Sequence, residues 1–76
     1  MNNKRRDLLK QAELFLEKAK ALVERAAEEE QDCIDNLPEN LQDSERCEKM
    51  ESAVYCLENA TGDIDEAIEN ITKAAS

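Results

Sequence analysis

Apolar side chains recur at alternating intervals of four and three residues near the start of the chain. The series comprises Leu8, Ala12, Phe15, Ala19, Leu22 and Ala26. This spacing is the heptad seam of a helix that packs against another helix. Leu9, Leu16 and Val23 lie beside the seam and widen the stripe, as expected for a helix with more than one neighbour. We therefore predict a first helix from about Lys4 to about Asp35.

The same alternation returns in the second half of the chain. The second seam comprises Met50, Val54, Leu57, Thr61, Ile64, Ile68, Ile71 and Ala75. Alanines flank it at intervals of seven residues, at Ala53, Ala60, Ala67 and Ala74. Such a ladder of small side chains allows two helix backbones to approach closely. We predict a second helix over residues 44–75.

The segment between the two helices, residues 36–43, contains the only proline of the chain. Pro38 lacks an amide proton and pushes the residue before it out of helical geometry, so a continuous helix is excluded here. Proline suits the first turn of a new helical segment. Asp43 or Ser44 is expected to cap the second helix. This segment is therefore predicted to be a corner.

Two helices of matched length and a short connector predict an antiparallel hairpin. Leu37 and Leu41 are expected to fold inward and fill its corner. The predicted fold class is all-α, a coiled-coil-like two-helix hairpin that forms one domain over residues 1–76. Because one hairpin does not cover the wide stripe of the first helix, we also expect a homodimer in the form of a four-helix bundle.

Gly62 is the one challenge to a continuous second helix. The segment around Gly62-Asp63-Ile64 resembles the second turn and third helix of ubiquitin-associated domains, which implies a chain break there and binding to ubiquitin-like partners. However, the seam continues through Gly62 without losing step, and one glycine costs a helix only about 1 kcal/mol. The continuous helix is the main prediction, and the break remains an alternative.

Composition and charge restrict the partners of the chain. It has 76 residues, of which 38% are charged, and its net charge is −9. Residues 1–25 carry seven basic and four acidic side chains, whereas residues 26–76 carry three basic and fifteen acidic ones. Such a chain is repelled by nucleic acid and by anionic membrane. We predict a cytoplasmic protein that binds a basic protein surface, with no direct nucleic-acid or membrane binding.

Catalysis and metal binding are not expected. The chain has no histidine, which removes the commonest general base and zinc ligand. The acidic corner lacks the ligand spacing and central glycine of a calcium loop. The sequence therefore predicts no catalytic residue, no metal site and no cofactor.

The three cysteines are predicted to be free thiols, as is usual in a reducing compartment. Cys33 and Cys47 flank the corner at seam-compatible positions and are expected to face each other as small core thiols, with a disulfide on oxidation as the alternative. Tyr55 and Cys56 fall just off the second seam. Tyr55 is either an exposed binding anchor or a contact within a dimer, and the sequence does not separate these alternatives.

Two sets of residues are the candidate sites. The predicted partner-binding surface, at the acidic tip and corner, comprises Glu28, Glu29, Glu30, Asp32, Asp35, Leu37, Glu39, Leu41, Asp43 and Glu45. The predicted dimer or core seam comprises Leu8, Leu9, Phe15, Leu16, Leu22, Val23, Met50, Val54, Leu57, Ile64, Ile68 and Ile71.

The corner string gives the chain a family resemblance. Residues 29–32, 35–42 and 44–46, followed by a helix rich in Ala, Ile and Glu, resemble short acidic proteins encoded by phages and mobile elements of bacteria. Where that group has glycine after Ser-Glu-Arg, this chain has Cys47. The resemblance implies a helical hairpin in a bacterial host cell and carries no activity.

Two functions remain after these exclusions. The first is a phage or mobile-element protein that docks on a host defence or nucleic-acid-handling protein and inhibits or modulates it. The second is a structural or assembly module, a dimeric four-helix bundle that serves as a scaffold or adaptor.

Overall fold

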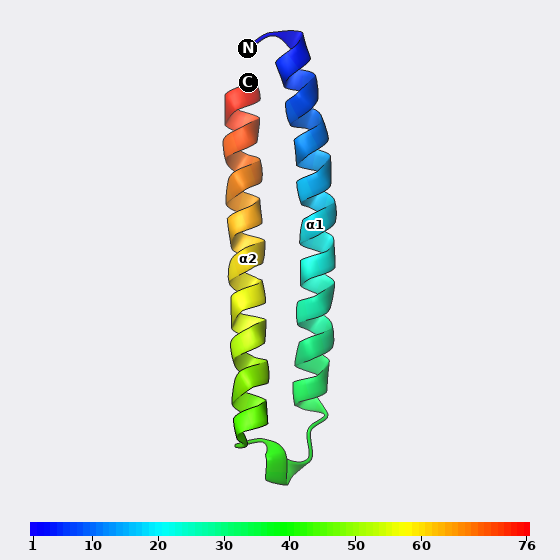
Figure 1. Ribbon diagram of the computed structural model, residues 1–76, viewed down its shortest axis with the longest axis vertical. Coiled ribbons are helices and arrows are strands. Elements are labelled where there is room, and N and C mark those ends of the chain that lie inside the picture. The colour runs from blue at the N-terminus through cyan, green and yellow to red at the C-terminus, as the bar shows by residue number, and fades with distance from the viewer.

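The chain folds into two long antiparallel helices joined by one tight corner (Figure 1). The structure is a computed structural model that describes all residues, Met1–Ser76. Helix α1 spans Asn3–Asp35, the short 3-10 helix η1 spans Glu39–Leu41, and helix α2 spans Glu45–Ala75. The molecule is a rod that measures 59 × 14 × 12 Å. The predicted all-α hairpin is confirmed.

Side-chain caps define where both helices begin. The Asn2 Oδ1 atom accepts a hydrogen bond from the Arg5 amide at 2.9 Å, and the Ser44 hydroxyl accepts one from the Cys47 amide at 3.2 Å. Each cap satisfies one of the amide groups that the first turn leaves without a partner. Of the two predicted caps for the second helix, the structure selects Ser44.

The corner ends α1 and reverses the chain. The side-chain amide of Asn36 donates to the Asp32 carbonyl at 2.8 Å, which satisfies one of the last carbonyls of α1. Pro38 is extended, with φ −57° and ψ 148°, and directly precedes η1. The Ser44 hydroxyl then donates to the Leu41 carbonyl at 2.6 Å, which joins the end of η1 to the start of α2.

The face that α2 turns toward α1 is the predicted one. Every member of the second seam is buried or half-buried, and Cys47 extends the seam one heptad toward the corner. Three of the four flanking alanines are half-buried, whereas Ala74 is exposed. The apolar alternation of α2 therefore predicts its packing face correctly.

The face that α1 turns toward α2 lies one residue C-terminal to the predicted seam. The buried and half-buried residues at alternating spacings are Leu9, Glu13, Leu16, Lys20, Val23, Ala27, Glu30 and Ile34. Leu8, Phe15 and Leu22 from the predicted seam are exposed. The flanking stripe therefore packs within the hairpin. The large side chains of the predicted seam face outward, whereas its Ala12 and Ala19 are half-buried.

The fully buried core is small and lies at the corner end. Ile34, Cys47 and Val54 are the three buried residues among 76, and Leu37 and Met50 pack against them. Leu37 therefore helps to fill the corner, as predicted. Elsewhere the interface between the helices is only half-buried, so the single hairpin holds its open end by shallow packing.

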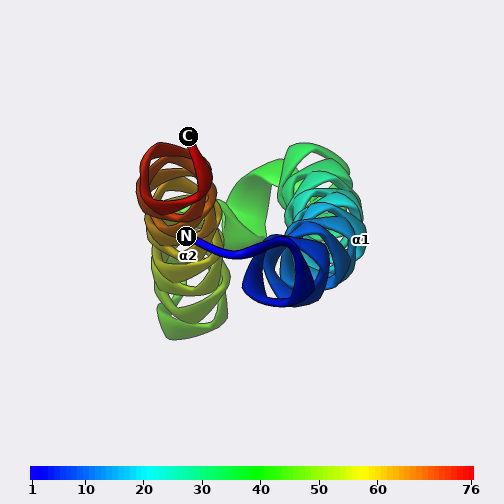
Figure 2. The same cartoon turned by 90° about the horizontal axis from the view of Figure 1, so that it is seen from above.

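The two helices cross as they run along the rod. Seen along the long axis, each helix drifts sideways, and the two drift in opposite directions (Figure 2). The chain termini meet at the open end of the rod, opposite the corner. Neither helix contains an apolar stretch that is long enough to span a membrane.

Helix α2 continues through Gly62, so the alternative of a chain break there is wrong for this structure. Gly62 has no positive φ, and a Cβ atom added to it would meet no other atom within 4 Å. We therefore predict that Gly62→Ala raises the free energy of unfolding by about 1 kcal/mol, measured by urea titration of helicity, because alanine favours a helix over glycine.

A control is Glu66→Gly, which introduces a glycine at an exposed site of the same helix. It should lower the free energy of unfolding by a similar amount. A loss of stability in Gly62→Ala would show that this backbone adopts a conformation that alanine does not tolerate.

Candidate binding surfaces

Polar contacts between the helices accompany the apolar packing. The Lys20 ammonium contacts Asp65 at 2.7 Å, and its hydrogen bond to that carboxylate raises the pKa of Lys20 above its usual value. The Thr72 hydroxyl donates to Glu13 at 3.1 Å. Lys20 and Glu13 lie in the interface between the helices, and each has a polar partner on α2. A charged side chain that is partly solvated and has such a partner is tolerated at an interface.

These contacts also fix the register of the hairpin. Glu13 lies seven residues before Lys20 on α1, and its partner Thr72 lies seven residues after Asp65 on α2. The two contacts therefore share one antiparallel register. At the open end, the Arg6 guanidinium donates to the Ala75 carbonyl at 3.1 Å, which places a basic side chain on a carbonyl of the last turn of α2. The carbonyl end of a helix favours positive charge.

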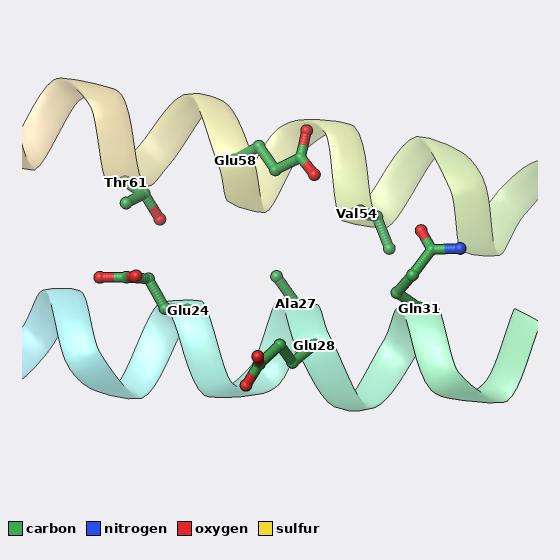
Figure 3. Close-up of a pocket in the computed structure, with 7 residues that line it drawn as sticks. All are labelled: Glu24, Ala27, Glu28, Gln31, Val54, Glu58 and Thr61. Carbon is green, nitrogen blue, oxygen red and sulfur yellow. The ribbon is translucent and has the colours of Figure 1, made fainter.

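An acidic groove runs along one side of the hairpin (Figure 3). Its volume is about 420 Å³. It is lined by Glu24, Ala27, Glu28, Gln31, Val54, Glu58 and Thr61. In Figure 3, Val54 and Ala27 form the floor between the helices, and the three glutamates carry the charge of the site.

The sequence analysis missed two of these glutamates, Glu24 and Glu58. Each follows directly after a residue of the helix interface, Val23 on α1 and Leu57 on α2. That position is the signal that would have found them. For Glu24, it becomes visible only once the correct interface of α1 is known.

The opposite side of the hairpin is apolar. On each helix, the residues that follow interface positions line the groove. The alanines that precede interface positions therefore lie on the other side of the hairpin. On α1, large side chains extend this surface outward: Leu8 is 58% exposed, Phe15 is 70% exposed and Leu22 is 68% exposed. We call the series Leu8, Ala12, Phe15, Ala19, Leu22 and Ala26 the outer stripe.

Most of the predicted acidic tip is exposed. Glu28, Glu29, Asp32, Asp35, Glu39, Asp43 and Glu45 are exposed, whereas Glu30, Leu37 and Leu41 are half-buried. Two of these acids have basic neighbours in the same helix, Arg25 beside Glu29 at 3.5 Å and Lys49 beside Glu45 at 3.6 Å. Exposed pairs of this kind neutralise little of the local field.

The Lys20–Asp65 pair divides the charge of the rod. Residues 1–20 and 65–76, toward the open end, carry seven basic and six acidic side chains. Residues 21–64, toward the corner, carry three basic and thirteen acidic ones. The entire net negative charge therefore lies in the corner half.

The cysteines differ from the prediction. All three are free, but Cys33 is exposed and Cys47 is buried, so they do not form a pair of core thiols. The helix places Cys33 on the outer side because its neighbour Ile34 occupies the core position. Tyr55 and Cys56 are exposed, as predicted.

No three His, Cys, Asp or Glu side chains converge in a way that would hold a metal ion. No protein-family model matches the chain, and comparison with curated proteins and with solved structures also finds no match. The fold defines the class as a helical hairpin with one acidic and one apolar side.

Burial raises the pKa of the Cys47 thiol above its ordinary value of 9.0, and the hydrogen bond from its Sγ atom to Glu51 at 3.4 Å adds to this rise. The thiol of the unfolded chain therefore loses its proton at a lower pH than the thiol of the folded chain. Because of this difference, a rise in pH above the ordinary pKa of the thiol favours unfolding. We predict that the free energy of unfolding falls as the pH rises past the ordinary pKa value of this thiol.

Part of this decline should be absent in Cys47→Ala and fully retained in Cys56→Ala, measured by denaturant titration at each pH. The second variant is the control because Cys56 is an exposed thiol on the same helix. Equal pH dependence in both variants would contradict the role given to the buried thiol.

Proposed function

We propose that the chain is a non-enzymatic protein-binding module whose acidic corner half docks on a basic surface of another protein. The observation that carries this proposal is the placement of the net charge. The corner half contains thirteen acidic and three basic side chains, and most of the tip acids are exposed. Charge of one sign on a narrow rod steers association with an oppositely charged surface.

The shape of the rod suits this mode of binding. Its cross-section of 14 × 12 Å is that of two packed helices. A negative rod of this width fits a basic groove that otherwise receives nucleic acid. We therefore propose a phage or mobile-element protein that occupies such a groove on a host defence or nucleic-acid-handling protein and blocks or modulates it. The absence of histidine and the shallow, open groove support a role in binding rather than catalysis.

Reversal of charge at the tip tests this proposal. The triple variant Glu28→Lys, Glu39→Lys and Asp43→Lys changes exposed side chains for which no ion pair is found. It should lose partner capture from bacterial lysate at low salt and keep its helicity. High salt should weaken capture by the unaltered protein, because screening shortens the reach of exposed charges.

The matched control places the same change of charge in the other half of the rod, in Asp7→Lys, Glu17→Lys and Glu66→Lys. These three residues are also exposed. Capture of the same partners, identified by mass spectrometry, should persist in the control. Equal loss in both triple variants would show that only total charge matters and would refute docking through the tip.

The second candidate function is self-association into a four-helix bundle that acts as a scaffold or adaptor. The outer stripe favours it, because three large apolar side chains at heptad spacing are more than half exposed. A contiguous apolar surface of this kind is typical of an interaction site. The small core of the single hairpin is a second reason, since three buried residues give a 76-residue chain little stability of its own.

Phe15→Glu tests self-association. Light scattering should give about twice the chain mass for the unaltered protein at tens of micromolar, whereas Phe15→Glu should be a monomer because a charge enters the apolar contact. Tyr55→Glu is the control, since Tyr55 is an equally exposed aromatic residue on α2 outside this stripe. A monomeric unaltered protein would reject this function, and dissociation by both variants would place the contact elsewhere.

A further inference from the structure

We propose that the outer stripe of α1 is covered by the outer stripe of a second copy, which runs in the opposite direction. This inference rests on the self-association proposed above and adds to it the contact surface, the direction and the register. Leu8, Phe15 and Leu22 have no cover within the hairpin. The argument for a second copy comes from the order of residues along this stripe.

The outer stripe is complementary to a second copy of itself that runs in the opposite direction. When two copies are aligned in opposite directions about a midpoint between Phe15 and Ala19, Phe15 of one meets Ala19 of the other. Leu8 then meets Ala26, and Ala12 meets Leu22. Every layer therefore places one large side chain against one alanine, which is the complementarity that close helix packing requires.

The same register continues into charged residues at both ends of the contact. In the next layer beyond the apolar ones, Arg5 of one copy meets Glu29 of the other. Both side chains are exposed in the single hairpin. On the flank of the stripe that faces away from α2, Lys4 of one copy lies near Asp32 of the other. The two-fold symmetry of such a dimer makes each of these opposite-charge contacts twice.

Two copies that run in the same direction lose both kinds of complementarity. Each residue of the stripe then meets itself, so Phe15 faces Phe15, Ala19 faces Ala19 and Glu29 faces Glu29. The two corner halves also lie side by side, each with thirteen acidic and three basic side chains. Like charges brought together in this way oppose association.

The antiparallel arrangement covers Glu29 and Asp32 of the acidic tip and leaves the rest of the tip and the acidic groove accessible. The acidic groove lies on the other side of each hairpin from the outer stripe. The contact ends where Met1 of one copy reaches Cys33 of the other, so Glu39 and Asp43 of each copy extend beyond it. The dimer therefore presents one acidic tip at each end and engages two basic surfaces at once.

The exposed thiol of Cys33 reports the direction of the two copies. In a Cys56→Ser variant, Cys33 is the only exposed cysteine. It lies 16 residues from the midpoint of the outer stripe. At a helical rise of 1.5 Å per residue, nitroxide labels on the two copies should be about 48 Å apart, measured by pulsed electron paramagnetic resonance.

The measured distance distinguishes a wrong direction of the two copies from a lack of self-association. A main distance below roughly 25 Å, as expected when both corners lie at the same end, would overturn the antiparallel arrangement and leave self-association intact. No dipolar signal, together with a monomer mass in sedimentation, would overturn self-association as well. Neither outcome bears on docking through the acidic tip, which the triple variants test separately.

A charge exchange tests the register. Arg5→Glu and Glu29→Arg should each raise the dimer dissociation constant about tenfold, because each disrupts two symmetry-related contacts. The double variant should return to within about threefold of the unaltered protein. Within one chain the two residues lie far apart on α1, so recovery reports a contact between copies. Loss of the Arg25 contact to Glu29 affects Glu29→Arg and the double variant alike.

The matched control exchanges two charges on the other side of α1, in Lys10→Glu with Glu24→Arg. Both residues are exposed, and no ion pair involves either of them. The dissociation constant of this control should stay within about twofold of that of the unaltered protein. Failure of the Arg5 and Glu29 double variant to recover, in a protein that remains a dimer, would overturn this register.

Discussion

The contact between Lys20 and Asp65 is the interaction on which the rest of the hairpin depends. Together with the hydrogen bond from Thr72 to Glu13, it gives partners on α2 to two charged residues that α1 turns toward that helix. A helix of this length carries two candidate seams that differ by a rotation of one residue, about 100°. The polar partners on α2 match only one of them. Once that seam is used, the outer stripe necessarily faces outward.

This choice of seam gives the rod its two different sides. Three of the eight interface positions of α1 carry charged residues, and the buried apolar core lies at the corner, where Ile34, Cys47 and Val54 meet. The glutamates that follow the interface residues line the acidic groove on one side. The alanines that precede them form the apolar side.

The sequence predicted the hairpin, the corner at Pro38 and the packing face of α2, because these depend on strong local signals. The interface of α1 was displaced by one residue. Hydrophobicity alone favours Ala12 and Ala19 over their neighbours Glu13 and Lys20. Only the cross-helix partners reverse that order, and a one-dimensional pattern does not contain them. The error about Cys33 has the same origin, since Ile34 takes the core position beside it.

The candidate surfaces followed the same division. The acidic tip depends only on where charges lie along the chain, and its members are mostly exposed as expected. The acidic groove depends on the rotation of α1 about its axis, so Glu24 and Glu58 were missed. Apolar residues beside a seam do indicate a second contact. The sequence did not show which stripe serves the hairpin and which remains free.

The two proposed interactions differ in their physical basis, and this difference lets one molecule use both. Docking through the tip relies on exposed charge, which salt screens within about 8 to 10 Å at physiological ionic strength. Packing of the outer stripe relies on apolar burial, which salt does not weaken in this way. Salt also screens the repulsion between two chains that each carry a charge of −9. The proposed dimer contact of Leu8, Phe15 and Leu22 would therefore persist under conditions that release a basic partner, so the proposed self-association and the proposed docking would respond oppositely to salt.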